Sequence, residues 1–231
     1  MDQLAEISAF FPAYNEERNL SRMVTALRQV LSEVSRRYEI IIVDDGSADG
    51  TKALAEKLAL QYPEVRVVHH PKNLGYGAAI RSGIRASRYS VIFFTDGDCQ
   101  FDVREICQLL PHIHSYDIVT GYRQKRADPF ARWLYSRGWN LAIRLLLGVK
   151  VKDLNCAFKM FKAEGVKTLP LKSTGALINA EILYYAQKKG LHVCEVPVRH
   201  YPRPAGNQTG GNPRVILRAF RELFQLLLNR S

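Results

Sequence analysis

Two carboxylates one residue apart carry the clearest chemistry in this chain. Asp96 and Asp98 follow the apolar run Val91–Phe94, and Gln100 comes two residues further on. An apolar run of this kind is typical of a strand that is buried on both faces. The carboxyl ends of such strands form the edge at which open α/β sheets bind ligands. Hard oxygen ligands there suit a Mg²⁺ or Mn²⁺ ion that also holds a diphosphate, whereas an isolated Asp-x-Asp would be a solvated turn.

Polar residues also follow two earlier predicted strands. Pro12 is expected to end the first strand, and Tyr14 behind it offers an aromatic face that suits stacking on a nucleobase. Asp44 and Asp45 close the second strand, where carboxylates can accept hydrogen bonds from a base and from ribose hydroxyls. Ordinary turn chemistry is the alternative at both places, and Asp49 in particular is expected to cap a helix.

A glycine-rich turn precedes the helix that is predicted over Gly77–Ala86. The turn, Asn73–Ala79, contains Gly75 and Gly77 but is followed by Ile80, where the dinucleotide fingerprint G-x-G-x-x-G needs its third glycine. The turn therefore disfavours a nicotinamide-dependent dehydrogenase. Its glycines instead allow close packing against a nucleotide or a neighbouring loop.

The composition indicates a folded, basic protein with an anionic partner. The 231 residues are 47% hydrophobic and 24% charged, and the formal net charge is +11. Such a charge favours a phosphorylated substrate, an anionic lipid surface or nucleic acid, with solubility alone as the alternative. Because no RNA-binding aromatic motif or helix-turn-helix pattern is evident, nucleic acid is not expected as a partner.

The cysteines, the histidines and the apolar segments indicate no further metal, disulfide or membrane-spanning site. The four cysteines form no C-x-x-C pair, which favours reduced thiols in a cytosolic setting. Four histidines have no ligand spacing toward the carboxylates and are expected to be structural; they are His69, His70, His112 and His114. Met1–Glu6 lacks the basic region of a signal peptide, and no apolar stretch approaches the roughly 20 residues that cross a bilayer. We therefore expect a cytoplasmic protein, peripheral on the cytoplasmic face of a membrane.

The order of the predicted elements favours an α/β fold. Through residue 125, short apolar runs alternate with segments that carry apolar residues at three- and four-residue spacing. This alternation predicts right-handed βαβ units and a mainly parallel open sheet flanked by helices. Strands are expected over Ile7–Phe11, Glu39–Val43, Val65–His69, Val91–Thr95 and Asp117–Thr120. Helices are expected over Arg18–Arg37, Thr51–Tyr62, Gly77–Ala86 and Val103–His114.

After residue 125 the pattern changes. The expected elements are a long helix over Phe130–Leu147, a strand over Phe158–Phe161, a helix over Asn179–Lys189, a strand over His192–Arg199, a loop over Pro202–Pro213 and a helix over Arg214–Leu228. The first and last helices combine large apolar residues with Arg, the composition of an amphipathic interfacial helix, with core packing or a dimer contact as the alternative. One domain is expected over residues 1–231, with a nucleotide-binding half (1–125) and an acceptor and membrane-proximal half (126–231).

Four segments in this order resemble the family 2 glycosyltransferases with a GT-A fold. They are Pro12–Glu17, Val43–Thr51, Asn73–Ala79 and Asp96–Gln100. Within that group the chain is most similar to the dolichyl- and polyprenyl-phosphate sugar transferases, such as the dolichyl-phosphate mannosyltransferases. Further matching pieces are Gly121–Arg123, Val151–Asp153, Cys156–Lys159, Glu195–Val198, Arg203, Gly206 and Gln208. The chain departs from the family pattern at two residues, Ala157 and Leu177, and these departures leave the identity of the sugar open.

The resemblance implies metal-dependent, inverting transfer of a sugar from a GDP- or UDP-sugar to a polyprenyl phosphate. It implies that the donor nucleotide is held by Pro12, Tyr14, Glu16, Val43 and Asp45, with Asp44 and Gly97 close by. It implies that Mg²⁺ or Mn²⁺, and through it the diphosphate, is bound by Asp96, Asp98 and Gln100. In the same way, Arg123 and Arg132 would hold the acceptor phosphate, and Arg203 and Gln208 would close over the donor diphosphate.

The acceptor decides whether a base is needed. A lipid monophosphate is already anionic and needs cations, which arginine supplies as a bidentate fork. A hydroxyl acceptor needs a general base within about 3 Å, and Asp153 is the first candidate, with a local turn residue as the alternative. The Q-x-x-R-W signature of processive polysaccharide synthases is absent, because Pro129 stands where its Gln would precede Arg132 and Trp133.

Two other functions stay open at this stage. The same fold could glycosylate a hydroxyl on a lipid or a polysaccharide, or the chain could be a non-catalytic nucleotide- or nucleic-acid-binding protein. Besides the donor and the acceptor, the expected partners are an anionic membrane surface and either a membrane subunit or a second copy of the chain.

Overall fold

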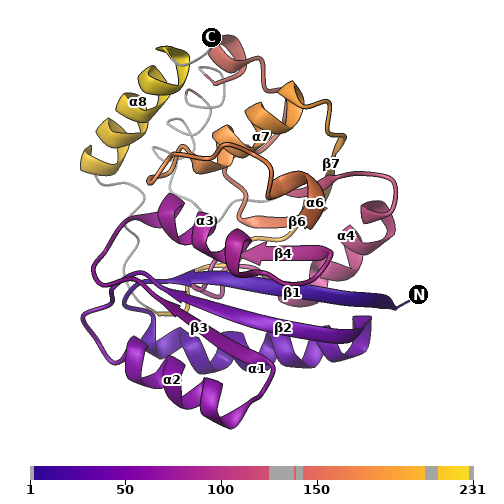
Figure 1. Ribbon diagram of the computed structural model, residues 1–231, viewed down its shortest axis with the longest axis vertical. Coiled ribbons are helices and arrows are strands. Elements are labelled where there is room, and N and C mark those ends of the chain that lie inside the picture. The colour runs from indigo at the N-terminus through magenta and orange to yellow at the C-terminus, as the bar shows by residue number, and fades with distance from the viewer. Residues whose placement is uncertain (1–2, 125–137, 139–142, 206–212, 229–231) are drawn as a thin grey trace.

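The computed structural model describes residues 3–124, 138, 143–205 and 213–228. Its centre is a seven-stranded sheet in the order β3-β2-β1-β4-β6-β5-β7 (Figure 1). The strands are β1 (Leu4–Ala13), β2 (Ser35–Asp44), β3 (Val65–His69), β4 (Val91–Thr95), β5 (Ile118–Arg123), β6 (Phe158–Lys162) and β7 (Val193–Val198). The sheet draws its strands from both halves of the chain.

The first four strands run parallel, as the alternation of elements predicts. β1 pairs in parallel with β2 and β4, and β2 pairs in parallel with β3. β6 is antiparallel to β4 and to β5, while β7 is parallel to β5. The carboxyl ends of β1, β2 and β4 consequently lie at one edge of the sheet.

Helices cover both faces of the sheet (Figure 1). One face carries α1 (Glu17–Val34), α2 (Thr51–Gln61) and α4 (Ile106–Ile113), which follows the short 3₁₀ turn η1 (Val103–Glu105). The other face carries α3 (Tyr76–Ala86), α6 (Ala163–Val166) and α7 (Ile178–Lys188). The last helix, α8 (Pro213–Leu228), contacts the turns at the start of α3 and before α7. None of the helices among the described residues has the length and apolar character that a membrane span requires.

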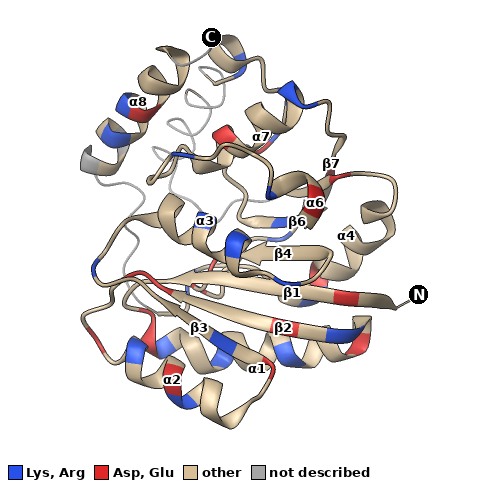
Figure 2. Cartoon of the chain, in the orientation of Figure 1, with Lys and Arg blue, Asp and Glu red and all other residues tan. Residues whose placement is uncertain are grey.

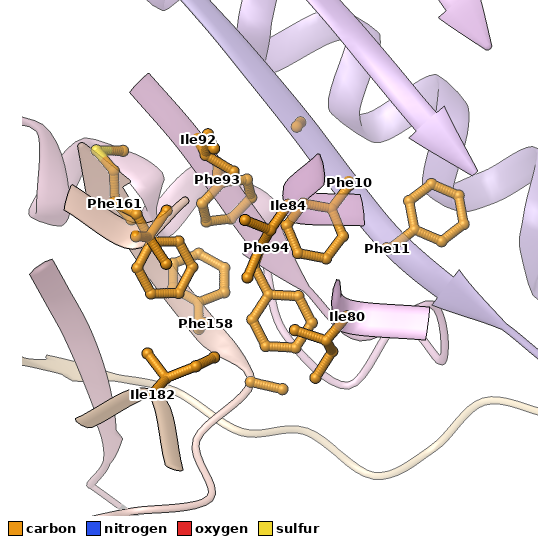
Figure 3. Close-up of a cluster of buried hydrophobic side chains, with 14 of the residues drawn as sticks. Phe10, Phe11, Ile80, Ile84, Ile92, Phe93, Phe94, Phe158, Phe161 and Ile182 are labelled. Atoms are coloured by element: carbon orange, nitrogen blue, oxygen red, sulfur yellow. The ribbon is translucent and has the colours of Figure 1, made fainter. Parts of the chain in front are cut away.

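The packing of the core explains why the sequence of β4 is an uninterrupted apolar run. Phe93 and Phe94 are fully buried and point to opposite faces of the sheet, so both faces need apolar cover (Figure 3). The ring of Phe94 stacks on Phe10 of β1 with centroids 5.1 Å apart. Phe93 meets Phe158 of β6 edge to face at 4.9 Å. These contacts fix the end of β4, and with it the position of the residues that follow.

At two predicted element ends the difference has a clear local cause. The helix predicted to reach Arg37 ends at Val34, because Ser35 is extended and its hydroxyl donates to the Leu31 carbonyl oxygen at 2.8 Å. Ser35 then pairs with Leu4 as the first residue of β2. Pro12, expected to end β1, lies inside it, since pairing with β2 continues to Ala13. The missing N–H of Pro12 costs nothing there, because pairing with β4 has already stopped at Phe10.

The remaining predicted elements differ only at their ends or fall on undescribed residues. β3 and β4 have the predicted bounds, and α8 starts one residue earlier than expected. Of the long helix predicted over Phe130–Leu147, residues 143–147 are helical, and most of the rest lies outside the described residues.

Candidate active site

The ends of three parallel strands bring the sequence-predicted residues together at one edge of the sheet. Ala13, at the end of β1, accepts a hydrogen bond from the N–H of Asp45 at 2.9 Å. Asp96 and Asp98 follow β4 on the other side of β1. Gly97 lies so close to β1 that a Cβ atom there would stand 2.7 Å from the Pro12 carbonyl oxygen. The prediction that these segments share an edge is confirmed.

The carboxylates of Asp96 and Asp98 repel one another. Burial and the neighbouring charge of Asp98 raise the pKa of Asp96 to about 7. Each carboxylate has one oxygen held by the chain, since Asp96 Oδ1 accepts from the Tyr76 hydroxyl at 2.8 Å and Asp98 Oδ1 accepts from the Gln100 N–H at 3.1 Å. The left-handed conformation of Cys99 (φ 57°) produces the tight turn that lets Gln100 reach back. A cation placed between the two carboxylates would relieve this repulsion.

The donor set fits a Mg²⁺ or Mn²⁺ ion that is shared with a substrate. Among the described residues, no group of three His, Cys, Asp or Glu side chains could hold a metal ion by itself. Mg²⁺ is commonly held by one or two carboxylates together with substrate phosphates and water. Asp96 and Asp98 supply the carboxylates. The side chain of Gln100, the third expected ligand, donates through Nε2 to the Tyr201 carbonyl oxygen at 3.0 Å, which leaves its metal role a prediction.

Arg203 joins two of the predicted motifs. Its Nη2 forms a close ion pair with Glu16, and its Nη1 lies 3.7 Å from Asp98 Oδ2. The arginine is held in place because its Nε donates to the Ala205 carbonyl oxygen at 2.7 Å and the N–H of Tyr201 donates to the Gln100 carbonyl oxygen at 2.8 Å. Arg203 therefore places a positive charge beside the carboxylates that would hold the ion. Burial is the main cause that raises the pKa of Glu16.

Asp44 and Asp45 are buried rather than open to a nucleotide, with 1% and 3% of their surfaces exposed. Asp45 accepts from the N–H of Gly75 at 2.9 Å and contacts Nδ1 of His70 at 2.6 Å. Asp44 contacts Nδ1 of His69 at 3.0 Å. The structural role expected of these histidines stays a prediction. Their contacts with Asp44 and Asp45 arise because strand register places β3 and its end beside β2, which spacing along the chain does not reveal.

Tyr14 lies at the surface, beyond the end of β1. It is 42% exposed. The next residue, Asn15, has a left-handed backbone (φ 56°), and its side chain accepts from the N–H of Ala48 at 2.8 Å. Val43 is fully buried in β2, so its side chain belongs to the core. The turn after β1 is thus tied to the turn after β2, with an aromatic ring exposed between the site and solvent.

Arg123 and Asp153, predicted for separate roles, form one ion pair. Arg123 Nε lies 2.7 Å from Asp153 Oδ2, and Arg123 Nη2 lies 2.9 Å from Asp153 Oδ1. Asp153 is 3% exposed. Beneath it, the fully buried Lys159 donates to the Thr120 hydroxyl at 2.7 Å, and burial lowers the pKa of this lysine. Because both oxygens of Asp153 contact Arg123, the pairing disfavours Asp153 as a base and favours it as the support of Arg123.

Four further residues from the sequence analysis are either outside the described residues or buried. Arg132 and Gln208 lie outside the described residues. Ala157 and Leu177, the two departures from the family pattern, are both buried. A side chain buried in the core cannot contact a sugar, so neither residue contacts the donor sugar directly in this structure.

Two residues of the site were missed by sequence reasoning. Tyr76 opens α3 and donates a hydrogen bond to Asp96, and Asn179 of α7 lies close enough to Tyr76 to influence its pKa. Tyr76 lies within the glycine-rich turn Asn73–Ala79, so the sequence analysis identified its segment but not its role. The contact itself joins residues that are far apart in the chain, and no pattern in the sequence reveals it.

A comparison with family models identifies the chain. The model described as "Glycosyl transferase family 2" matches residues 8–169, which run from β1 through α6. The chain belongs to glycosyl transferase family 2. The matched segment contains the carboxylates after β4 and the Arg123–Asp153 pair.

Two of the curated relatives of this glycosyltransferase are named for polyprenyl or polyprenol phosphate sugars. It is 32% identical over 218 residues to polyprenol monophosphomannose synthase of Mycolicibacterium smegmatis, covering 88% of this chain and 81% of the relative. It is 30% identical over 230 residues to dodecaprenyl-phosphate galacturonate synthase of Rhizobium johnstonii, covering 97% of this chain and 66% of the relative. It is 31% identical over 208 residues to glycosyltransferase AglD of Haloferax volcanii, covering 86% of this chain and 33% of that longer relative.

Solved structures confirm the GT-A fold of this glycosyltransferase. Glucosyl-3-phosphoglycerate synthase of Mycobacterium tuberculosis in complex with UDP superposes with a TM-score of 0.73 at 18% identity, covering 98% of this chain and 82% of that chain. The same enzyme with Mn²⁺, UDP and glucosyl-3-phosphoglycerate gives a TM-score of 0.71 at 20% identity, covering 98% of this chain and 80% of that chain. At these identities the likeness shows the fold alone.

Proposed function

We propose that this glycosyltransferase moves a sugar from a nucleotide diphosphate to a polyprenyl phosphate, with Mg²⁺ or Mn²⁺ at Asp96 and Asp98 and inversion at the anomeric carbon. The observation that carries the proposal is the meeting of two mutually repelling carboxylates with the half-buried Arg203 at the carboxyl edge of the sheet. Such an edge is where open α/β sheets bind ligands. The net charge of +11 and the relatives named for polyprenyl phosphates support the choice of substrates.

On the donor side, Asp96 and Asp98 hold the ion, and Arg203 contacts the diphosphate. A metal ion bound there would stabilise the negative charge that grows on the departing phosphate oxygen. Arg203 leaves Asp98 when the diphosphate arrives, because phosphate oxygens offer its guanidinium a bidentate partner. Tyr14 stacks on the base, and Glu16 stays behind Arg203. Asp45 supports the nucleotide site through the Gly75 turn that it holds.

On the acceptor side, Arg123 holds the lipid phosphate. Its positive charge opposes the rise in the pKa of Asp96, which supports a role for both residues in one site. The bidentate contact with Asp153 fixes the orientation of the guanidinium. An anionic phosphate oxygen attacks without a base, and Asp153, with both oxygens against Arg123, fits that reaction better than a hydroxyl acceptor.

We also propose that α8 rests on an anionic membrane surface, where a polyprenyl phosphate would be found. Four large apolar side chains form a stripe on its outer side at three- and four-residue spacing, with exposed fractions of 54%, 51%, 63% and 65% for Leu217, Phe220, Phe224 and Leu228. The opposite side is buried through Ala219, Leu223 and Leu226. Figure 2 shows basic residues along α8. One of them, Arg221, is exposed next to the stripe, and apolar residues flanked by arginine are typical of an interfacial helix.

The test is direct detection of the product. Purified protein is incubated with Mn²⁺, a short polyprenyl phosphate and, in turn, GDP- and UDP-sugars, and the lipid fraction is analysed by mass spectrometry. We expect a sugar-phosphate lipid with one donor and the inverted anomer by NMR. Transfer only to hydroxyl acceptors, or no product with any donor, would contradict the proposal.

A further inference from the structure

Tyr76 makes a contact with the site that no catalytic assignment requires. Its hydroxyl donates to Asp96 Oδ1 at 2.8 Å, and the residue is half-buried as the first residue of α3. The phenol stays neutral, because burial and the negative charge of Asp96 raise the pKa of Tyr76 well above its usual value. A neutral hydrogen-bond donor is thus fixed on one of the two carboxylates that would hold the metal ion.

The backbone around Tyr76 is held from two sides. Gly75 has a left-handed conformation (φ +105°), and its N–H donates to Asp45 Oδ2 at 2.9 Å. On the other side, the N–H of Gly77 donates to the Thr174 carbonyl oxygen at 2.9 Å. The Tyr76 ring also packs against Phe94, with centroids 6.4 Å apart. The hydroxyl is therefore a fixed point, and Asp96 must adopt the rotamer that reaches it.

Asn179 of α7 lies beside Tyr76. It is 3% exposed, and it opposes the rise in the pKa of the phenol that burial causes. The contact that fixes Asp96 is the hydrogen bond that the Tyr76 hydroxyl donates to Asp96 Oδ1.

We propose that Tyr76 is a positioning residue of the metal centre, holding Asp96 Oδ1 so that Oδ2 is presented to the ion. The inference rests on the proposed metal site. Asp98 is arranged in the same way, since its Oδ1 accepts from the Gln100 N–H and its Oδ2 faces Arg203. Both carboxylates then bind the ion through one oxygen each and keep the other for the protein. Residues that hydrogen-bond metal ligands contribute roughly 10- to 100-fold to metal affinity.

The test compares the Mn²⁺ affinity of the wild type, Tyr76→Phe and Tyr38→Phe without any nucleotide. Free Mn²⁺ is followed by electron paramagnetic resonance at about pH 8, where Asp96 is mostly ionised. Tyr38→Phe is the matched control, because that hydroxyl also meets a carboxylate, Glu64 at 3.4 Å, away from the site. We expect roughly tenfold weaker binding for Tyr76→Phe and no change for Tyr38→Phe. Equal or tighter binding by Tyr76→Phe would overturn the role of Tyr76.

Asp98→Ala separates this inference from the proposed function. If the wild type and Asp98→Ala bind Mn²⁺ alike, the metal site itself is wrong and the proposed function fails with it. If only Tyr76→Phe resembles the wild type, the metal site stands and the role of Tyr76 is refuted. Should Tyr76→Phe not fold, Tyr76→Leu, which also lacks the hydroxyl, is measured in its place: weaker Mn²⁺ binding supports the role of Tyr76, and unchanged binding overturns it.

Discussion

Removal of Arg203 should change metal binding and donor binding in opposite directions. Its guanidinium lies 3.7 Å from Asp98 Oδ2, where it would compete with an incoming cation. With nucleotide diphosphate bound, the same guanidinium would instead stabilise the phosphates. Arg203→Ala should therefore bind Mn²⁺ alone more tightly and bind the nucleotide more weakly.

The magnitude follows from the geometry. Unit charges about 4 Å apart attract by about 4 kcal/mol at an effective dielectric constant of about 20. Desolvation and side-chain ordering offset most of this attraction, so that about a third of it, roughly 1.4 kcal/mol, is left as the net contribution. A free-energy difference of that size corresponds to a tenfold change in affinity. Both side chains are 14% exposed, so solvent screens the pair only in part. We expect about tenfold tighter binding of Mn²⁺ alone.

Two titrations measure the effect. Mn²⁺ binding without nucleotide is followed by electron paramagnetic resonance, and binding of UDP or GDP at saturating Mn²⁺ by calorimetry. Arg28→Ala is the control, since it removes one positive charge from an ion pair with Glu64, whose carboxylate is not among those after β4. Weaker binding of Mn²⁺ alone by Arg203→Ala, or unchanged nucleotide binding, would refute the reasoning.

Three further predictions concern the acceptor, pH and the membrane. Asp153→Asn should raise the KM for the polyprenyl phosphate roughly tenfold and leave the KM for the donor unchanged, because only the support of Arg123 is weakened; equal changes in both would argue for general misfolding. Mn²⁺ binding should weaken up to tenfold per pH unit below about pH 7, because a proton on Asp96 competes with the ion, and a flat profile between about pH 5.5 and 8.5 would contradict this. Since the folded-state pKa of Asp96 is raised, the metal-free protein should also lose stability as pH rises toward 7, and Mn²⁺ should restore it above that pH in thermal-unfolding experiments. The double variant Phe220→Ser and Phe224→Ser should reduce sedimentation with anionic vesicles several-fold without lowering Tm, because both side chains are more than half exposed. Unchanged sedimentation would contradict the proposal that α8 binds the membrane.

The sequence was sufficient where local pattern and topology act together. The apolar run before Asp96 predicts a strand with the bounds that β4 has, because a strand between two layers of helices must be apolar on both faces. Parallel neighbours then bring the ends of β1, β2 and β4 to one edge without further information. The sequence pattern and the parallel topology together are therefore enough to predict that the carboxylates lie at a ligand-binding edge.

The sequence was insufficient where side chains meet across the chain. The contacts between Tyr76 and Asp96 and between Arg123 and Asp153 join residues 20 and 30 positions apart. Such contacts depend on strand register and on the packing of α3, which single residues do not encode. The end of α1 was missed for a different reason: a local hydrogen bond from Ser35, rather than a loss of apolar spacing, ends the helix.

The most direct test of the account is sugar transfer to a short polyprenyl phosphate before and after metal removal, in the wild type and in Asp98→Ala. We predict that EDTA abolishes product in the wild type, that Mn²⁺ restores it, and that Asp98→Ala forms none although its thermal unfolding remains cooperative. Undiminished transfer in EDTA, or by Asp98→Ala, would contradict the claim that two carboxylates after β4 hold the ion that binds the donor diphosphate.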